Sequence, residues 1–561
     1  MNFFPHWKFP MAGVALVLLL AACATTPPPP PLEVACADLA RAAIPGGRVT
    51  KAALVPAGKQ KVNMRTATPE FEVPGHCDVW GRLHERTGVD GKPYHIGFNL
   101  RLPLQWNGRF LFQGGGGTDG VIRESVGLLP GGGQTGGALL RGFAVVSTDA
   151  GHQDEPGPLG GYLFGLDPQA RSDLGYAHLP PVNAAANALM SRAYGRSPDY
   201  RYFSGCSNGG RQGMMAAQRF PDLFDGIIAG APAYRVPYAA AEATQQTQLL
   251  ATISPKAPNG KPLIGSAFTR DEIKTIADGI LNACDAQDGA KDGMVHDIKG
   301  CKFNPKTLVC AAGQTQACLS PAKADVVEKL FAGAKLSNGT RFYSDWPYDP
   351  GINHPGWLVW RIGMNPTAMP PGAINATLIP GSLAYAFTTP PDRPTDLYDY
   401  ALNYQADVGV PKLSARSGIY KESADEHSNP TSTNLDAFKA RRGKILFFHG
   451  MSDPIFSAND TVRYVEALRA RDSAAEFERY SRLYLVPGMT HCSGGIATDK
   501  FEMLQPMMDW VEKGIAPQQL VGEAGPQSPW PKRTRPLCAW PQQAFYKGHG
   551  DLESAANFVC R

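Results

Sequence analysis

A serine in a glycine-rich turn constrains the fold of this chain more than any other feature. The stretch YFSGCSNGGRQG, from Tyr202 to Gly213, holds Gly-Cys-Ser-Asn-Gly around Ser207. Apolar residues precede this turn, as in a short buried strand, and small residues follow it, as at the start of a helix. A strand, a tight turn and a helix form the G-x-S-x-G elbow that exposes a nucleophilic serine at the edge of a sheet. The alternative is a structural serine in a glycine-rich turn.

Two later segments carry the partners that a nucleophilic serine needs. The stretch KILFFHGMSDPIFS predicts a strand whose following loop holds Asp453, and RLYLVPGMTHCSGG predicts a strand whose loop holds His491. This order of serine, acid and histidine is that of the α/β-hydrolases. His449 is a rival base, but it lies at a strand end and we interpret it as a packing residue. We predict that His491 takes the proton of Ser207 and that Asp453 orients His491.

The oxyanion of an acyl-transfer intermediate needs backbone N–H donors. One should be the N–H of Asn208, which directly follows the nucleophile. The other should come from the glycine run in FQGGGGTDG, which follows the apolar strand RFLF. Glycine backbone can approach a developing negative charge closely. A flexible loop is the alternative, but the position after an early strand favours the oxyanion role.

The cysteines indicate an oxidising environment. Of the eleven cysteines, one lies in the N-terminal region, and the other ten allow up to five disulfides in an exported chain. Proximity in the sequence favours three pairs: Cys284–Cys301, Cys310–Cys318 and Cys538–Cys560. Cys36 and Cys77 are then available to pair near the N-terminus. This leaves Cys206 and Cys492. Cys206 directly precedes Ser207, and Cys492 directly follows His491. A disulfide between them would hold the two catalytic groups together. In the alternative, either cysteine pairs elsewhere or stays free.

The N-terminal residues predict export. Lys8, the apolar run MAGVALVLLL and the small residues AACA form the pattern of a signal peptide in residues 1–22. The residues LAAC resemble a lipobox, so we expect Cys23 to be lipidated and to anchor the chain to a membrane. An ordinary secretory signal is the alternative. Residues 24–34, rich in proline, predict a stiff spacer. We expect an outer-membrane lipoprotein of a Gram-negative bacterium, or otherwise a secreted protein.

Length and charge set wide limits on the architecture. The chain has 561 residues, is 43% hydrophobic and carries a net charge of +4 with both signs dispersed. We therefore expect a large core, no nucleic-acid partner and no protein partner. The α/β pattern stops after GIIAGAPA and returns at KILFF. We predict an α/β catalytic domain in residues 35–233 and 441–561, interrupted by a lid domain in residues 234–440.

The predicted lid contains a loop that is rich in carboxylates. The stretch CDAQDGAKDGMVHD places Asp285, Asp288 and Asp292 close together with glycines between them. Such oxygen ligands suit Ca²⁺, although the spacing is not that of an EF-hand. The alternative is a solvated acidic turn. The loop lies far in the sequence from the triad, so we expect any calcium to be structural.

These segments together resemble the tannase and feruloyl esterase family over nearly the whole chain, nearest to its branch that hydrolyses mono(2-hydroxyethyl) terephthalate. The resemblance is carried by QGGGGTDG, STDAGH, GCSNGGRQGMMAAQRFPDLFDGIIAGAPA, HGMSDPIFS, LVPGMTHCSGG and RTRPLCAWPQ. It implies an α/β-hydrolase core with a large lid, and a disulfide between the two site cysteines. It also implies oxyanion donors at Gly117 and Asn208. For the calcium site it implies the carbonyl groups of Ala290 and Met294 beside the three aspartates.

The resemblance further implies which residues touch the substrate. Trp360 matches a lid tryptophan that packs on the aromatic acid, and Phe456 matches a phenylalanine of the pocket, although core packing alone would explain either residue. The full set of implied contacts is Trp360, Phe456, Val236, Ile455, Leu378 and Ser382.

One departure from this branch bears on the substrate. The branch has a lid arginine that pairs with the free carboxylate of terephthalate monoesters, but residues 362–392 contain no Arg or Lys. Ile374 lies near the place of that arginine, and Leu378 stands where an aromatic residue is expected. Loss of a bidentate partner should weaken the binding of acid-ended substrates. We therefore expect esters of uncharged aromatic acids, such as hydroxycinnamates or gallates, or a neutral terephthalate diester.

The predicted function is that of an exported serine carboxylesterase for small aromatic esters, working through an acyl-enzyme and without an organic cofactor. One alternative is hydrolysis of the terephthalate monoester itself. A peptidase on the same fold is disfavoured, because no propeller or clamp for a peptide terminus is evident. A calcium-stabilised surface binding protein without catalysis is the alternative of another class, and the complete triad argues against it.

Overall fold

The computed structural model describes residues 6, 31–63, 68–129, 131 and 137–561. The predicted signal peptide, Cys23 and most of the predicted spacer lie outside the described residues. The end of that spacer is helical, because α1 (Leu32–Ala35) begins within it and buries Leu32 against the catalytic core. Among the described residues, no helix has both the length and the apolar character needed to cross a membrane.

A ten-stranded mixed sheet forms the centre of the catalytic domain, in the order β1-β2-β5-β6-β8-β7-β9-β10-β11-β12. The first part is antiparallel and contains β1 (Ala43–Ile44), β2 (Gly47–Val55), β5 (His76–Thr87) and β6 (Pro93–Pro103). The second part is parallel and contains β8 (Ala144–Thr148), β7 (Arg109–Gln113), β9 (Tyr200–Cys206), β10 (Gly226–Gly230), β11 (Lys444–Gly450) and β12 (Ser481–Val486).

Both faces of the parallel strands are buried, which explains their continuous apolar sequences. Alternate residues of β10 face opposite sides: Ile227 packs in one cluster, and Ile228 packs in another. Helices α3 (Leu179–Tyr194), α4 (Asn208–Arg219) and α15 (Ala458–Asp472) contribute to the first cluster. Helix α17 (Leu504–Lys513) contributes to the second. Polar catalytic groups therefore have to come from the loops at the strand ends.

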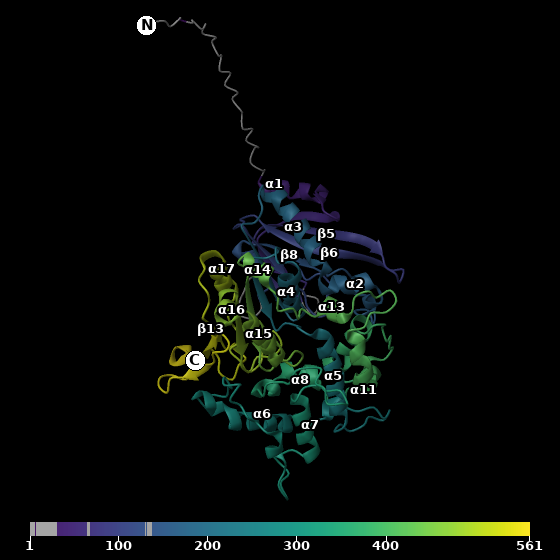
Figure 1. Cartoon of the computed structure of the whole chain (residues 1–561), viewed down its shortest axis with the longest axis vertical. Helices are drawn as coiled ribbons and strands as arrows, with labels where there is room; N and C mark the ends of the chain where they lie inside the picture. Colours follow the sequence, from purple (N-terminus) through teal and green to yellow (C-terminus); the bar gives the residue numbers. More distant parts are fainter. Residues whose placement is uncertain (1–5, 7–30, 64–67, 130, 132–136) are drawn as a thin grey trace, which may run out of the picture.

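The lid is inserted between β10 and β11, two strands that are neighbours in the sheet. Its main helices are α5 (Val236–Ala251), α6 (Arg270–Cys284), α7 (Pro321–Phe331), α8 (Pro355–Arg361) and α11 (Leu397–Asn403). They lie together at the end of the molecule opposite α1 and α3 (Figure 1). The lid has its own apolar core, which also takes in Ile455 and Phe456 from the loop after β11. The lid is thus packed directly on the loop that follows Asp453.

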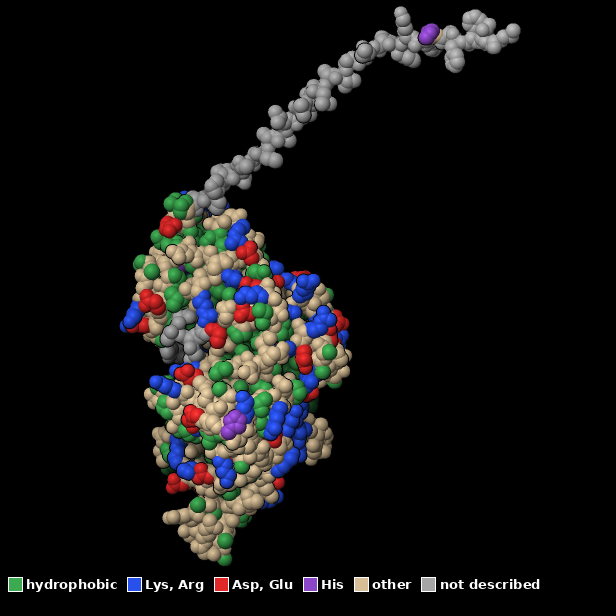
Figure 2. All heavy atoms as spheres, turned by 90° about the vertical axis from the view of Figure 1, so that its left-hand side faces the viewer, with side chains coloured by type: hydrophobic (Ala, Val, Ile, Leu, Met, Phe, Trp, Pro, Cys, Tyr) green, Lys and Arg blue, Asp and Glu red, His purple; other side chains and the backbone are tan. Residues whose placement is uncertain are grey.

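The end of the insertion returns to the catalytic domain before β11 begins. The short helix α14 (Asp436–Ala440) packs Phe438 in the same cluster as the strands and α15. The surface mixes charges: Figure 2 shows Lys and Arg side chains interspersed with Asp and Glu over the face that it presents.

Five disulfides link the described residues, and they are the five pairs that the sequence predicts. They join Cys36–Cys77, Cys206–Cys492, Cys284–Cys301, Cys310–Cys318 and Cys538–Cys560. Four of them close local loops, whereas Cys206–Cys492 spans 286 residues of sequence. Such a disulfide content is typical of proteins that fold outside the reducing cytosol, so the chain is an exported protein.

Candidate active site

Ser207 occupies the strained turn that the sequence predicts. It follows β9 and caps α4, with φ 64° and ψ −126°, a conformation that non-glycine residues rarely adopt. Its N–H donates to the carbonyl oxygen of Gly230 (3.0 Å), and its own carbonyl accepts from the N–H of Ala233 (3.0 Å). A Cβ atom on Gly205 would lie 2.7 Å from the backbone carbonyl carbon of Gly209. The strand and the helix can therefore approach this closely only because residue 205 has no Cβ atom, and the lack of a Cβ atom on Gly209 gives room for the backbone of Gly115.

Asp453 lies in the loop after β11 and is fully buried. Its Oδ1 accepts hydrogen bonds from the N–H groups of Ile455 (2.9 Å) and Phe456 (3.0 Å), and its Oδ2 accepts from Nδ1 of His491 (2.7 Å). Burial by itself would raise the pKa of this carboxyl, but the charge of His491 and hydrogen bonds from His449 and His491 outweigh it. They hold the pKa of Asp453 well below its usual range. The acid is therefore ionised, and it orients His491 with Nε2 left for the nucleophile.

His449 is a packing residue, as its place at the strand end indicates. It is fully buried, with Nδ1 2.9 Å from Oγ1 of Thr461 and Nε2 3.0 Å from the carbonyl oxygen of Phe456. The structure adds a contact that the sequence did not reveal, because its Nε2 also lies 3.4 Å from Oδ2 of Asp453. His449 thus gives the buried acid a second imidazole neighbour beside His491.

The disulfide between Cys206 and Cys492 links the elbow to the histidine loop. Their Cα atoms lie 6.0 Å apart. Because these cysteines adjoin Ser207 and His491 in sequence, the bond limits how far the nucleophile and the base can separate.

Ser207 and His491 line a cavity of about 710 Å³ between the sheet edge and the lid. All six implied substrate contacts line the same cavity: Trp360, Phe456, Val236, Ile455, Leu378 and Ser382. The rings of Trp360 and Phe456 each have their centroid 5.5 Å from that of His491. An aromatic acyl group bound beside these rings would have its carbonyl carbon next to the triad.

The charge of the cavity differs from one side to the other. On the lid side, the described lining includes Ile374, Leu378 and Ile379 and holds no Lys or Arg. Arg361, the neighbour of Trp360, lines the small cavity beside Asp453 instead. On the catalytic-domain side, Arg123 and Arg211 line the cavity, and no Asp or Glu is among the described lining residues. The sequence analysis did not identify Arg123. Its position shortly after the glycine run is the signal that could have indicated it.

The glycine run forms the wall of the cavity next to the elbow. It follows β7, and the N–H of Gly114 donates to the carbonyl oxygen of Ser204 in β9 (2.9 Å). Gly117 has φ 63°, and both it and Asn208 line the cavity beside Ser207. Within the described part of the chain, the N–H groups of Gly117 and Asn208 donate to no protein acceptor. They have the position and the freedom that oxyanion donors need.

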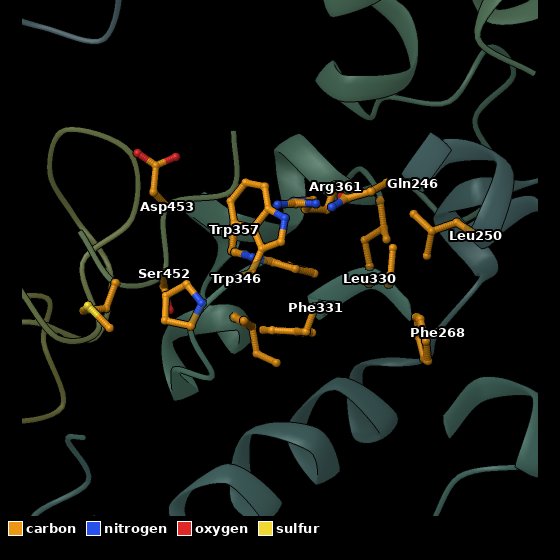
Figure 3. Close-up of a pocket in the computed structure, with 14 residues that line it drawn as sticks. Gln246, Leu250, Phe268, Leu330, Phe331, Trp346, Trp357, Arg361, Ser452 and Asp453 are labelled. Atoms are coloured by element: carbon orange, nitrogen blue, oxygen red, sulfur yellow. The ribbon is translucent and has the colours of Figure 1, made fainter. Parts of the chain in front are cut away.

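Lid residues and Asp453 together line a second, smaller cavity. A small cavity of about 30 Å³ adjoins Asp453, and Figure 3 shows the lid residues Trp346, Trp357 and Arg361 around it. The guanidinium of Arg361 lies 4.0 Å from the ring centroid of Trp346 and 4.0 Å from Oε1 of Glu242. Helix α8 thus brings Trp360 to the main cavity and Arg361 to the small cavity that adjoins Asp453.

A buried lid carboxylate joins the two catalytic loops. Asp349 accepts hydrogen bonds from Oγ of Ser452 and from the N–H of Gly488 (2.9 Å), which lie in the loops of Asp453 and His491. Burial raises the pKa of Asp349, and these hydrogen bonds counter part of that rise. No local sequence pattern pointed to Asp349, because its partners lie more than one hundred residues away in the chain.

The three aspartates of the predicted calcium loop lie on one turn that the Cys284–Cys301 disulfide closes. Asp288 is 1% exposed and accepts from the N–H groups of Ala290 (3.0 Å) and His296 (3.3 Å). Asp292 is paired with Arg535. Among the described residues, no three or more His, Cys, Asp or Glu side chains are grouped so that they could hold a metal ion. The loop therefore fits calcium only in part, through buried Asp288 and the neighbouring carbonyl groups.

Comparisons with known proteins agree with this geometry. A family model described as tannase and feruloyl esterase matches residues 77–561. Mono(2-hydroxyethyl) terephthalate hydrolase of Piscinibacter sakaiensis is 42% identical over 519 residues, which cover 87% of this chain and 85% of that protein. A probable feruloyl esterase of Arthroderma benhamiae is 32% identical over 83% of this chain and 84% of its own length.

Solved structures share the fold. Feruloyl esterase B of Aspergillus oryzae superimposes with a TM-score of 0.75 at 23% identity, covering 94% of this chain and 100% of that one. Tannin acyl hydrolase of Aspergillus niger gives a TM-score of 0.66 at 22% identity, covering 93% and 94%. The predicted fold class, an α/β-hydrolase core with a large lid, is confirmed.

The disulfide beside the triad generates a test. Replacing Cys206 and Cys492 together by serine should lower kcat by roughly 10- to 100-fold, because a displacement of about 1 Å at a catalytic group costs that much. The free energy of unfolding should fall by about 2–4 kcal/mol. Initial rates on an ester and urea unfolding measure the two effects. The matched control, Cys310→Ser with Cys318→Ser, removes a lid disulfide and should leave kcat unchanged. Unchanged kcat in the first variant would contradict the assigned role.

Proposed function

Because this chain belongs to the tannase and feruloyl esterase family of carboxylic ester hydrolases, we propose that it is a serine esterase that cleaves esters of aromatic carboxylic acids. One observation carries the proposal: Ser207 and His491 line one cavity together with Trp360 and Phe456, and His491 is paired with buried Asp453. This arrangement supplies a nucleophile, a base and an aromatic surface for the acyl group within one enclosed space.

The reaction follows from this arrangement. Oγ of Ser207 attacks the ester carbonyl carbon while Nε2 of His491 takes its proton, and the N–H groups of Gly117 and Asn208 stabilise the oxyanion. The tetrahedral intermediate collapses and expels the alcohol, which receives the proton from His491. Water, deprotonated by His491, then attacks the acyl-enzyme, and the aromatic acid is released as His491 returns the proton to Oγ of Ser207. Asp453 stays ionised throughout and stabilises the charged form of His491.

The preferred acyl group is the uncharged one. The relative named above as a terephthalate monoester hydrolase is 42% identical, so the monoester is the competing substrate. The described lid lining offers apolar Ile374 and Leu378 where a carboxylate partner would be needed. An unpaired carboxylate buried against apolar side chains loses its hydration without compensation. We therefore infer that neutral aromatic esters are turned over faster than acid-ended ones.

Parallel initial rates test this preference. The substrates are methyl ferulate, methyl gallate, and the bis- and mono(2-hydroxyethyl) esters of terephthalate, with Ser207→Ala as the inactive control. We expect kcat/KM for the monoester to be lower than for the neutral diester by about tenfold or more, since a charge-assisted hydrogen bond contributes about 1.5–3 kcal/mol. Ile374→Arg should raise kcat/KM for the monoester selectively, whereas Ile374→Gln should not.

Equal rates on the two terephthalate esters would contradict the preference. Arg123 would then be the cation to test, because it lines the cavity from the catalytic domain. In that case Arg123→Gln should lower kcat/KM for the monoester and leave the diester unchanged.

We also propose that the loop of residues 285–294 binds structural Ca²⁺ through Asp285, Asp288 and Asp292 and the carbonyl oxygens of Ala290 and Met294. Buried Asp288, which forms no ion pair with a described Lys or Arg, supports it. The ion would supply the positive charge that this carboxylate lacks, and Asp292 would share its carboxylate between Arg535 and the ion.

Thermal unfolding with CaCl₂ and with EGTA tests the calcium proposal. Free Ca²⁺ at about 100 times the dissociation constant should add about 2.7 kcal/mol of stability and raise Tm. Asp288→Asn should abolish this increase. The matched control is Asp278→Asn, which removes an exposed acid of α6 that pairs with Lys274. An equal Tm in calcium and in EGTA, or an undiminished increase in Asp288→Asn, would contradict the proposal.

We further propose that the exported chain is a lipoprotein anchored through Cys23, as the lipobox pattern supports. The full chain produced in a Gram-negative host should enter the detergent phase of a Triton X-114 partition, and Cys23→Ser should enter the aqueous phase. Recovery of the unsubstituted chain in the aqueous phase would contradict the anchor.

A further inference from the structure

A buried side-chain network joins the glycine run to helix α4, and we propose that Asp119 and the side chain of Asn208 are positioning residues for the oxyanion hole. Their contacts set the separation and direction of the two backbone donors, the N–H groups of Gly117 and Asn208. The inference rests on the oxyanion role proposed above for these N–H groups.

Asp119 is the centre of the network. It follows the glycine run, is 3% exposed and has φ 55°. Its Oδ1 accepts from the N–H of Gly116 (2.8 Å). Its Oδ2 accepts from Nδ2 of Asn208 (2.8 Å) and from Nε2 of Gln212 (2.8 Å). One carboxylate therefore holds both the glycine run and the first turn of α4.

Helix α4 contributes three polar side chains to the network, those of Asn208, Arg211 and Gln212. Gln212, 1% exposed, also accepts through Oε1 from the N–H of Gly115 (2.9 Å). Oδ1 of Asn208 accepts from Nε of Arg211 (2.8 Å). Because one end of the Asn208 amide accepts and the other donates, its orientation between Arg211 and Asp119 is determined.

Arg211 is itself immobilised. It is 1% exposed and donates through Nη1 to the carbonyl oxygen of Gly175 (2.7 Å) and through Nη2 to that of Leu174 (2.8 Å). Its charge also balances the carboxylate of Asp119, which would otherwise oppose the negative charge that develops on the substrate. The network is thus anchored to a segment outside both halves of the oxyanion hole.

The glycine run needs this support because four consecutive glycines have little conformational preference of their own. The N–H groups of Gly115 and Gly116 donate to Gln212 and Asp119, whereas the next N–H along the chain, that of Gly117, has no described protein acceptor and belongs to a residue that lines the cavity. Preorganised donors stabilise an oxyanion only if they need no rearrangement during the reaction. The side chains of Asp119 and Gln212 provide this rigidity, because the glycine run has no side chains of its own.

Exchange of the two partners provides the test. Asp119→Asn sets an amide nitrogen against a donor in either orientation, namely against Nδ2 of Asn208 and Nε2 of Gln212 or against the N–H of Gly116. Asn208→Asp places a second carboxylate against Asp119. Each single variant should lower kcat by roughly 10- to 100-fold, within the range for disturbing an oxyanion donor, with KM changed less than threefold. The double variant restores one donor–acceptor pair in the reverse direction and keeps the contact to Arg211, so its kcat should recover at least fivefold over the lower single variant.

A matched pair separates positioning from stability. Asn99 donates through Nδ2 to Oδ1 of Asp78 (2.8 Å), and both residues are buried in the antiparallel part of the sheet, away from the cavity. Asp78→Asn should lower Tm without the loss of kcat. Asn208→Ala is the second test variant, because it keeps the backbone N–H and removes only the amide link. It should lower kcat even where the Asp119 variants do not fold.

The outcomes distinguish this inference from the proposed function. Absence of ester turnover and of fluorophosphonate labelling at Ser207 in the unsubstituted chain would overturn the proposed function. With that chain active, unchanged kcat in Asn208→Ala and in the single variants would overturn the network's role. It would also be overturned if the losses of kcat only accompanied a fall in Tm like that of Asp78→Asn, or if kcat did not recover in the double variant. Loss of kcat at constant KM with recovery in the double variant would support it.

Discussion

The parallel register of β9, β10, β11 and β12 decides where this protein can carry out chemistry. Gly230 of β10 lies opposite Cys206 of β9 and opposite Phe448 of β11, so β9 and β10 end together and β11 continues only to Gly450. The nucleophile follows the end of β9, the acid follows β11, and the histidine follows β12. Since both faces of these strands are buried, only the loops at this edge can present polar groups to a substrate. The triad is thus a consequence of strand pairing over long sequence distances.

The lid is inserted at the same edge and does more than cover it. It supplies Trp360 to the cavity, and on the same helix Arg361 lines the small cavity that adjoins the catalytic acid. Asp349 joins the acid loop to the histidine loop through buried hydrogen bonds. Buried hydrogen bonds of this kind cost about 1–3 kcal/mol when one partner is lost. The folding of the lid and the geometry of the triad are therefore coupled.

Rigidity at this site comes from different sources for different groups. Ser207 is held by close backbone packing at two glycines, and His491 by an ionised acid and a neighbouring disulfide. The glycine run has no side chains, so hydrogen bonds from its N–H groups to Asp119 and Gln212 hold it in place. The backbone packing offsets the strain at Ser207, and the hydrogen bonds offset the conformational freedom of the glycine run.

The sequence by itself determined the elbow, the order of the triad and the pairing of the cysteines. These are local patterns: a serine between glycines, loops that follow apolar strands, and cysteines adjacent to the catalytic residues. The lid contacts were implied by family resemblance, and Trp360 alone would have been interpreted as core packing. Only the tertiary structure decided that Asp349 bridges two loops and that Asp119 accepts hydrogen bonds from both Gly116 and Asn208. Those contacts join segments that lie far apart in the chain, and no local periodicity or spacing encodes which distant hydrogen-bonding groups will meet once the sheet and the lid have packed.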